Sequence, residues 1–329
     1  MHDEFIEAVF SALNENKMLE SGDAVAVALS GGADSVSLLL ALKELEQRLG
    51  ISVSACHVNH NLRGEESLRD MRFCEELCGR LGVPLRTASI DVRAAQQKHE
   101  SLEECARRLR YDFFESVLSE LGSRAKLATA HNANDNAETV LLNLIRGTAL
   151  KGLCGIPPVR GRIIRPLLSC TRADIEAFLS EAGEKCVVDS TNLCDDYTRN
   201  KVRHIILPEM EKINPSLVRS AARMTSSLCS DSEYLESLAE KALSETKTAA
   251  GYDAKRLSES PLPIKSRAVK RILQEGGIEP SALRINTALS LLEKRSARFN
   301  PCRDRFFTIR KGVCFVEKTE QHYKKQEKK

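Results

Sequence analysis

The 329-residue sequence has no long hydrophobic run and no Cys-x-x-Cys pair, and each absence removes a class of protein. Its purely apolar runs span only a few residues, as in 38–42, whereas a membrane helix needs about 20. The 11 cysteines are odd in number and most lie within apolar periodic patterns, which disfavours a disulfide framework, a zinc ribbon and a Cys-pair iron–sulfur site. The acidic N-terminus lacks the basic-then-apolar layout of a signal peptide. We therefore predict a cytoplasmic chain with reduced thiols and no membrane association.

Positive and negative charges are nearly balanced overall but unevenly distributed. The 49 Lys and Arg residues against 46 Asp and Glu residues give a net charge of +3. Residues 1–200 carry −7 and residues 201–329 carry +10, so the C-terminal part is expected to meet an anionic partner. Aromatic residues are few there, and a basic surface that serves only solubility is the alternative.

Short apolar runs alternate with helical patterns through the first 150 residues. We predict strands over 23–29, 51–58, 84–91 and 126–130, and helices over 35–48, 65–81, 102–121 and 133–146. This alternation predicts an α/β fold with a parallel sheet and helices on both faces. Ligands of such sheets bind at the carboxyl ends of the strands.

The later part of the sequence changes character. A loop punctuated by Gly and Pro covers 150–165, a short helix is expected over about 171–182, and beyond 210 the pattern is mostly helical with a hairpin at 306–316. We predict a catalytic domain over 1–212, a smaller, mainly helical C-terminal domain over 213–323 and a disordered basic tail over 324–329.

The most specific motif is Ser30-Gly31-Gly32-Ala33-Asp34-Ser35, between a predicted strand and a predicted helix. The glycines let the backbone approach an anion, while amides of the turn and of the helix N-terminus point at it, with two hydroxyls beside them. The segment contains neither a Walker A loop nor Gly-x-Gly-x-x-Gly. An ordinary tight turn with an Asp or Ser cap is the alternative, but the complete motif favours a phosphate site.

Four more polar clusters lie at strand ends or on adjoining helices. They are residues 57–63, 104–111, 129–139 and 189–203. Asp135 and Glu138, three apart near a helix start, converge where an ammonium group or Mg²⁺ would bind; helix capping by Asn132 with Asp135 is the alternative. His57 and His60 lack a third metal ligand nearby.

Two pairs of arginines have both a functional and a structural interpretation. Arg107, on a long helix with Arg110, either reaches phosphates or pairs with Glu103 one turn earlier. Arg199 and Arg203, four residues apart, either clamp a phosphate or RNA backbone or form a solvated basic face.

The Ser30–Ser35 motif resembles the pyrophosphate loop of the N-type ATP pyrophosphatase (PP-loop) superfamily, whose members split ATP between the α- and β-phosphates. Together with Arg146-Gly147 and Arg165-Pro166-Leu167-Leu168, the clusters in this order resemble bacterial tRNA(Ile)-lysidine synthetases, densely over about 20–215. The chain is short for that family, some members of which carry a further C-terminal domain. The resemblance implies an adenine nucleotide alpha hydrolase-like catalytic domain and a tRNA-binding role for residues 213–323.

The activity implied by the resemblance is an AMP-forming carbon–nitrogen ligation. ATP adenylates the C2 oxygen of the wobble cytidine in the CAU anticodon of tRNA(Ile), and the ε-amine of L-lysine then displaces AMP. ATP and Mg²⁺ are the implied cofactors, tRNA(Ile) and L-lysine the implied partners, and a homodimer is left open.

The resemblance also implies roles for individual residues. The implied ATP-binding residues are Ser30, Gly31, Gly32, Ala33, Asp34, Ser35, His57 and His131. The implied catalytic residues are Asp34, Arg107, Asp135 and Glu138, with Asp34 as the candidate Mg²⁺ ligand. The implied lysine or tRNA ligands are Asn59, Arg63, Arg110, Asp135, Glu138, Arg199, Asn200 and Arg203. Asn134 stands where many relatives carry Asp.

Two other functions compete with this one. A sibling enzyme that thiolates cytidine in tRNA would be expected to carry paired cysteines, for which Cys74 and Cys78 are the nearest substitute. A nucleotide sensor without turnover would lack the convergent carboxylates and arginines that this sequence has.

Overall fold

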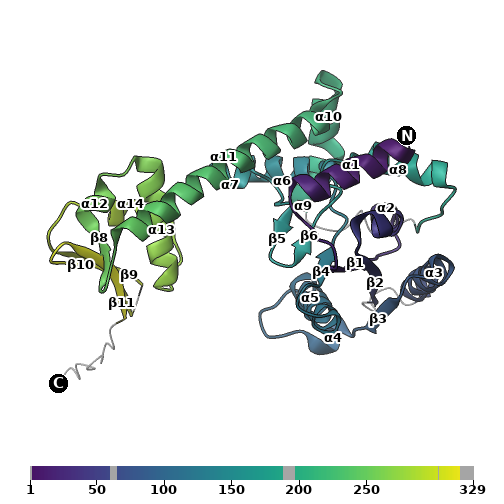
Figure 1. Cartoon of the computed structure of the whole chain (residues 1–329), viewed down its shortest axis with the longest axis horizontal. Coiled ribbons are helices and arrows are strands. Elements are labelled where there is room, and N and C mark those ends of the chain that lie inside the picture. The colour runs from purple at the N-terminus through teal and green to yellow at the C-terminus, as the bar shows by residue number, and fades with distance from the viewer. Residues whose placement is uncertain (1, 60–64, 188–196, 303, 319–329) are drawn as a thin grey trace. The chain divides into compact units, whose positions relative to one another are not determined.

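A computed structural model describes residues 2–59, 65–187, 197–302 and 304–318 (Figure 1). The chain divides into two compact units, Met1–Leu228 and Cys229–Lys329, and the division falls within the long helix α11 (Leu217–Thr246). The domain boundary that we predict, between residues 212 and 213, precedes this helix and stays a prediction.

The first unit contains a six-stranded sheet in the order β3-β2-β1-β4-β6-β5. Its strands are β1 (Ala24–Ala28), β2 (Ser52–Asn59), β3 (Leu85–Ser89), β4 (Lys126–Ala128), β5 (Val159–Arg160) and β6 (Ile163–Ile164). All neighbours are parallel except β5, which pairs antiparallel with β6 at the edge. The predicted α/β fold with its parallel sheet is confirmed.

The order of the strands identifies where a ligand would bind. From β1 the chain adds β2 and then β3 on one side, and it later adds β4 on the other side of β1. The connections therefore diverge between β1 and β4, and the carboxyl ends of these two strands lie at the topological switch point, where such sheets bind their ligands. The Ser30–Ser35 segment follows β1, and the polar segment from Thr129 follows β4.

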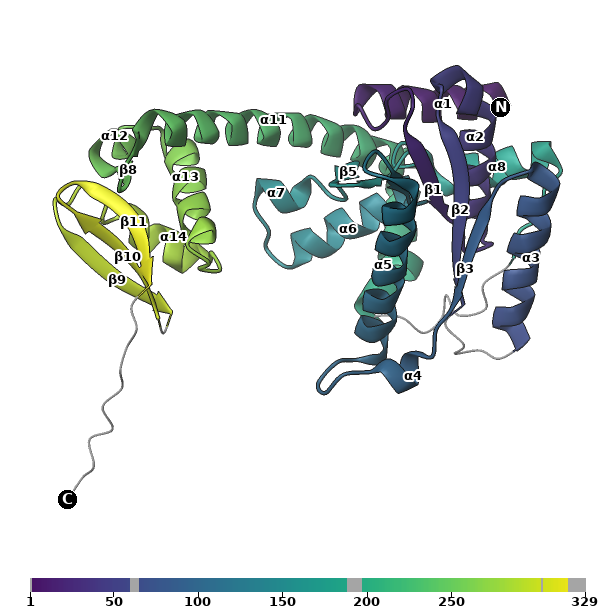
Figure 2. The ribbon, with the colours of Figure 1, turned by 60° about the horizontal axis from the view of Figure 1, so that its bottom comes forward.

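Helices cover both faces of this sheet. They are α1 (His2–Glu15), α2 (Ala33–Leu49), α3 (Glu65–Leu81), α4 (Val92–Ala95), α5 (Leu102–Leu121), α6 (Ala133–Ile145), α7 (Leu150–Leu153), α8 (Arg172–Ala182), α9 (Tyr197–Lys201), the π-helix η1 (Val202–Ile206) and α10 (Leu207–Ile213). Figure 2 shows the strands between α5 on one side and α3 on the other.

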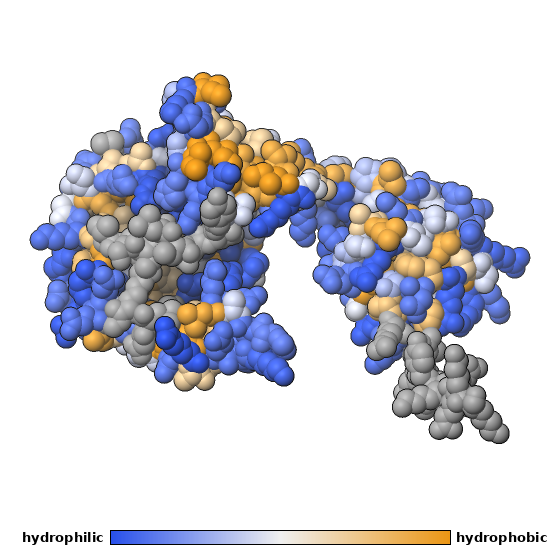
Figure 3. Space-filling model, turned by 180° about the vertical axis from the view of Figure 1, so that it is seen from behind, coloured by the Kyte–Doolittle hydropathy of each residue, from blue (hydrophilic) through white to orange (hydrophobic). Residues whose placement is uncertain are grey.

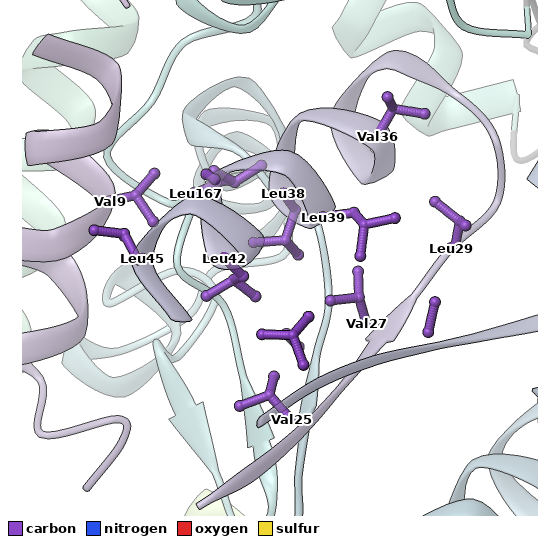
Figure 4. Packing of buried hydrophobic residues seen from close by; sticks show 14 of the residues in the cluster. Val9, Val25, Val27, Leu29, Val36, Leu38, Leu39, Leu42, Leu45 and Leu167 are labelled. Carbon is purple, nitrogen blue, oxygen red and sulfur yellow. The ribbon is translucent and has the colours of Figure 1, made fainter. Parts of the chain in front are cut away.

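Alternation along the strands distributes their side chains between the two faces. Val25 and Val27 of β1 pack with Leu38, Leu39 and Leu42 of α2 in the larger core (Figure 4). Ala26, between the two valines, belongs to a second core that contains residues of α5. The sheet is buried on both faces, which explains the nearly continuous apolar runs in the sequence.

The second unit combines helices with an antiparallel sheet in the order β7-β8-β11-β10-β9. Its further elements are β7 (Lys247–Thr248), β8 (Gly251–Asp253), α12 (Ala254–Ser258), α13 (Leu262–Glu275), α14 (Ala282–Leu289), β9 (Ala297–Cys302), β10 (Arg305–Arg310) and β11 (Val313–Lys318). The predicted hairpin corresponds to β10 and β11. The sequence pattern did not predict β7 and β8, which are only two and three residues long, or β9, which contains Pro301.

Large hydrophobic side chains are exposed on several elements of the described chain. No helix among the described residues is long and apolar enough to cross a membrane. Figure 3 shows hydrophilic residues over much of the visible face of each unit, with hydrophobic residues gathered near α10 and the start of α11. Ile213 of α10 and Met224 of α11 are exposed there.

Candidate functional site

The loop after β1 forms a compact turn that its own hydroxyl groups stabilise. The Ser35 hydroxyl oxygen accepts from the Ser30 amide at 3.1 Å and lies 3.0 Å from the Ser30 hydroxyl oxygen. It also donates to the Gly32 carbonyl at 3.0 Å. These bonds hold both hydroxyl groups at the start of α2.

The N-terminus of α2 carries no side-chain cap. Gly32 is its N-cap residue, in extended conformation, and it has no side chain with which to bond the free amides of the first turn. Amides in this position point away from the helix and carry its positive end, which is the arrangement that binds phosphate. The predicted alternative, a turn capped by Asp or Ser, is therefore not what α2 uses.

Gly31 is required by both its backbone and its surroundings. Its φ of +90° is unfavourable for any residue with a side chain, and a Cβ atom would lie 3.3 Å from Val187 and 3.4 Å from Phe73. The Gly31 carbonyl accepts from the Val187 amide at 2.8 Å, which fixes this conformation.

We expect Gly31→Ala to lower the free energy of unfolding by about 1–2 kcal/mol, because the left-handed conformation is strained with a Cβ. It should also weaken ATP binding about tenfold, since the loop amides move. Gly79→Ala is the matched control: Gly79 lies inside α3, where an added Cβ would meet nothing within 4 Å, so that variant should be neutral or slightly stabilised. Urea unfolding and calorimetric ATP titration measure both effects. Equal free energies of unfolding for the two variants would contradict the strain at Gly31.

Asn132 joins the loops after β1 and β4. Its side-chain oxygen accepts from the Asp135 amide at 3.0 Å, and Asp135 accepts from the Asn132 amide at 3.2 Å, which completes a capping box at the start of α6. The Asn132 side-chain nitrogen donates to Asp34 Oδ1 at 3.1 Å. The predicted capping alternative for Asp135 is therefore observed, and the same asparagine also brings Asp34 to α6.

Asp34 is a partly buried carboxyl group in an acidic neighbourhood. Burial raises its pKa, the bond from Asn132 opposes this effect, and nearby Asp135 raises the pKa further. An ionised carboxylate in this position is stabilised by a cation, and Mg²⁺ is commonly held by one or two carboxylates together with substrate phosphates. The residues present therefore fit a phosphate-bound Mg²⁺.

Asp135 and Glu138 form a four-residue ion cluster with Arg199 and Arg203. Arg199 Nε donates to Glu138 Oε2 at 3.0 Å, while Arg203 donates to Glu138 and, through Nη2 at 3.0 Å, to Asp135 Oδ1. The side chain of Glu138 is only 2% exposed, against 39% for Arg199 and 27% for Arg203. The predicted carboxylates and the predicted basic pair thus neutralise one another.

A π-helix positions the second arginine of this cluster. Arg199 and the half-buried Asn200 lie on α9, and Arg203 lies on η1, which continues directly from α9. Such segments occur mostly as single turns and often at functional sites. On the other side of the cluster, Asn136 holds α6 in place by donating to Thr225 of α11 at 2.9 Å.

The two candidate histidines lie at different strand ends. His57 of β2 lies 2.8 Å from the Leu29 carbonyl through Nδ1, so Nδ1 is the protonated nitrogen, and its buried Nε2 has no partner among the described residues. His131 follows β4 and contacts the Thr129 hydroxyl at 3.1 Å. Burial lowers the pKa of His131, with Asp135 acting in the opposite direction, so the neutral imidazole is favoured at neutral pH.

The remaining predicted site residues lie on α5, at the end of β2, or outside the described residues. Arg107 is exposed on α5 with its guanidinium 5.1 Å from the Tyr111 ring centre, and burial lowers the pKa of Arg110 on the same helix. Asn59 is buried at the end of β2. Arg63, like the 189–192 segment and the 324–329 tail, lies outside the described residues.

Arg165 begins the Arg-Pro-Leu-Leu motif that contributes to the resemblance, but the motif alone predicted no role for its side chain. It directly follows β6 and is 5% exposed, and its Nη1 donates to the Pro157 carbonyl at 2.6 Å. Its Nε has no partner among the described residues. The only signal in the sequence was its place after a short apolar run, and two residues are too few to reveal a strand.

Six of the ten cysteines in the described residues are buried, and the other four are half-buried. Burial raises the pKa of Cys74 to about 12 and that of Cys78 to about 11, which disfavours the reactive thiolate. Across residues 2–59, 65–187, 197–302 and 304–318, no three His, Cys, Asp or Glu side chains are grouped as a metal site.

Comparisons with known proteins agree with this geometry. Residues 3–210 match the family of PP-loop domains. The tRNA(Ile)-lysidine synthase of Clostridium perfringens (strain 13 / Type A) is 43% identical over 236 residues, which are 71% of this chain and 50% of that protein. The synthase of the same name from Caldanaerobacter subterraneus subsp. tengcongensis is 36% identical over 300 residues, 88% of this chain and 64% of that protein.

The chain spans about half the length of many of the curated relatives that it matches. Among solved structures, the U34-tRNA thiolase NcsA from Methanococcus maripaludis with its 4Fe–4S cluster has a TM-score of 0.57 and 20% identity, over 69% of this chain and 78% of that one. That similarity concerns the fold. Together these matches confirm the resemblance that the motifs predicted.

Proposed function

The chain belongs to the PP-loop domain family, and on that premise we propose that it joins L-lysine to C2 of the wobble cytidine of tRNA(Ile) with a CAU anticodon. ATP is the co-substrate, and the products are the lysidine-containing tRNA, AMP and pyrophosphate. The observation that carries this proposal is the Asn132–Asp34 bond, which brings the uncapped end of α2 and the acidic start of α6 together at the switch point of the sheet.

The loop after β1 would bind the leaving pyrophosphate. The free amides of α2 and the hydroxyl groups of Ser30 and Ser35 surround a position suited to concentrated negative charge. Asp34 would hold Mg²⁺ against the phosphates, and the metal would supply charge stabilisation. The buried Nε2 of His57, which has no partner among the described residues, would serve as an acceptor for an amino group such as that of adenine.

The start of α6 would organise the second half of the reaction. The C2 oxygen of cytidine attacks the α-phosphorus, and the bond to pyrophosphate breaks. The ε-ammonium group of lysine then loses a proton, the resulting amine attacks C2, and the bond from C2 to the oxygen breaks, so that AMP leaves with the oxygen. Asp135 is the more exposed carboxylate of the cluster, with 18% of its side chain accessible against 2% for Glu138, so it is the better candidate to receive an ammonium group.

Arg199 and Arg203 would hold these carboxylates in place through their hydrogen bonds. Their guanidinium groups balance the charge of the buried Glu138 carboxylate through hydrogen bonds. Each guanidinium group also has N–H groups that do not bond to Glu138. Arg107 and Arg110 of α5 would add positive charge that attracts a phosphate group of RNA or nucleotide, and the charge of Arg107 already acts on His131.

The second unit would contact the tRNA backbone. Residues 229–329 contain 21 Lys and Arg residues against 14 Asp and Glu residues, and this net charge of +7 supports a salt-dependent interaction with phosphates. Several of its arginines are already engaged, since Arg298 and Arg310 both pair with Glu317. Contact with the tRNA backbone would therefore depend on those basic side chains of the second unit that are not paired with an acid.

A thiolating enzyme is the second candidate, because a thiolase shares the fold. The raised pKa values of Cys74 and Cys78 argue against a thiolate at the only cysteine pair one helical turn apart.

Pyrophosphate release from ATP tests the proposal directly. Each of the twenty amino acids is supplied with unmodified tRNA(Ile) bearing CAU, and tRNA(Met) is the control. We expect release only when lysine and tRNA(Ile) are both present. Release without an amino acid but with a sulfur donor would assign the chain to the thiolases. ATP binding without turnover under every condition would leave it as a nucleotide sensor.

A further inference from the structure

Arg165 lies beside the candidate site on the side of the sheet that α5 covers. Ile164 packs in the core with α2, whereas Ile163 packs in the core with α5. Because successive side chains of a strand alternate between faces, Arg165 is directed to the same side as Ile163. β6 is parallel to β4, and the Thr129 amide donates to the Ile164 carbonyl at 2.9 Å, so Arg165 lies level with the start of the polar segment after β4.

The guanidinium group reaches toward the carboxyl edge of the sheet. β5 runs antiparallel to β6, so Pro157, which precedes β5, lies beyond the carboxyl end of β6. Arg165 Nη1 donates to the Pro157 carbonyl at 2.6 Å. This bond fixes one nitrogen and leaves the edge formed by Nε and Nη2 directed elsewhere.

No acid within the described part of the chain balances this buried charge. Arg165 is 5% exposed and forms no ion pair with a described carboxylate, and its Nε has no acceptor there. The groups whose charges affect the pKa of Arg165 are Tyr111, Arg160 and Arg107, while burial is the main cause that lowers it. A buried cation without a counter-ion is unfavourable, so its presence suggests that a ligand supplies the anion.

The position and burial of Arg165 limit the kinds of anion that could bind to it. The pyrophosphate loop follows β1, which is separated from β6 by β4, so the two sites are about 10 Å apart at a strand spacing of about 4.8 Å. A 5% exposed side chain is accessible to a small ligand that reaches the carboxyl edge of the sheet, but not to a phosphodiester on the surface of a folded RNA. Two parallel N–H groups on one guanidinium edge match the two oxygens of a carboxylate.

The opposite charge is that of Asp135, which lies at the start of α6, the helix that follows neighbouring β4. Burial lowers the pKa of His131, the charge of Asp135 raises it and the charge of Arg165 lowers it, so an acid and a base both lie near this imidazole. A free amino acid carries an ammonium group and a carboxylate that match such a pair. We propose that Arg165 binds the α-carboxylate of the free amino acid that the enzyme uses, which is lysine if the proposed function holds.

Neutralising the carboxylate of the amino acid tests this inference. Lysine and lysinamide, whose carboxylate is replaced by a neutral amide, are compared as substrates of the wild-type chain, Arg165→Gln and Arg160→Gln. Arg160 is the matched control, because it is exposed on neighbouring β5. We expect wild type and Arg160→Gln to prefer lysine by about 10- to 100-fold in KM, which is typical of hydrogen bonds to a charged group. Arg165→Gln should lose this preference while its KM for lysinamide and for ATP stays unchanged.

Other outcomes overturn the inference. An equal rise of the KM values for lysine and lysinamide in Arg165→Gln, or a rise of the KM for ATP, would mean that Arg165 positions the site or binds phosphate. If Arg165→Gln does not fold, the wild-type comparison decides alone, because equal use of lysine and lysinamide contradicts a carboxylate subsite.

Calorimetric titration of the ATP-loaded chain separates this inference from the proposed function. Lysidine formation together with equal binding of lysine and lysinamide would leave the function standing and remove the subsite. Carboxylate-dependent binding of another amino acid, lost in Arg165→Gln and without lysidine formation, would remove the function and keep the subsite. Binding of no amino acid by the wild type would remove both.

Discussion

Asp34→Asn is expected to reduce pyrophosphate release by about 10³-fold or more while leaving the chain at least as stable as the wild type at neutral pH. The size of the rate effect follows from the proposed function, in which the charge of Asp34 would stabilise the leaving pyrophosphate by holding Mg²⁺ against it. The amide keeps the shape of the side chain and can still accept from Asn132, so the loop after β1 stays connected to α6. A variant that retained a tenth of the wild-type rate would remove Asp34 from the catalytic machinery.

The pH dependence of stability gives an independent readout of the same residue. Burial raises the pKa of Asp34 above its ordinary value of 3.8, so folding favours the protonated form. The stability that Asp34 contributes in its protonated form is complete below pH 3.8 and is lost as the pH rises through the higher folded-state pKa. Relative to Asp34→Asn, the wild type should therefore lose free energy of unfolding on the way to neutral pH.

Urea unfolding at a series of pH values measures this difference. Asp112→Asn is the control, because Asp112 is exposed on α5 and should show no such divergence from wild type. Parallel stability curves for wild type and Asp34→Asn would show that the carboxyl group is not desolvated in the folded chain.

Local patterns explain how much of this fold could be predicted. The helix predicted over 133–146 is α6 (Ala133–Ile145), and the strand predicted over 51–58 is β2 (Ser52–Asn59), because both have strong periodicity and clear boundaries. The Ser30–Ser35 loop was recognisable since its glycines, hydroxyls and flanking elements are consecutive in the sequence. The capping box of Asn132 with Asp135 joins residues only three positions apart, so it could also be predicted.

Contacts between distant residues could not be derived in the same way. Glu138 meets Arg199 and Arg203 across 61 and 65 positions of the sequence. Each partner had two interpretations when considered alone, and nothing in either segment indicates that they neutralise each other. The buried position of Arg165 likewise depends on β5 and β6, which are two residues each and carry no periodic signal.

The ion cluster leads to the second large effect, a loss of stability and activity in Glu138→Gln. Removing the acid from a buried ion pair leaves its cations uncompensated, which costs about 3–5 kcal/mol when all partners are buried. Arg199 and Arg203 are 39% and 27% exposed, so water screens part of this cost and we expect a loss of about 2–3 kcal/mol.

The same substitution should reduce pyrophosphate release about 100-fold or more, because α6 and η1 both lose the acceptor that joins them and Asp135 is displaced with them. Glu176→Gln is the matched control, since Glu176 forms an exposed i,i+4 pair with Arg172 that should contribute less than about 0.5 kcal/mol. A lower urea midpoint at unchanged m-value identifies a loss of stability rather than a change in the unfolded state. Equal midpoints for the two variants would mean that Glu138 is already solvated in the folded chain, and the cluster would then be a surface feature rather than the connection between α6 and the arginines of α9 and η1.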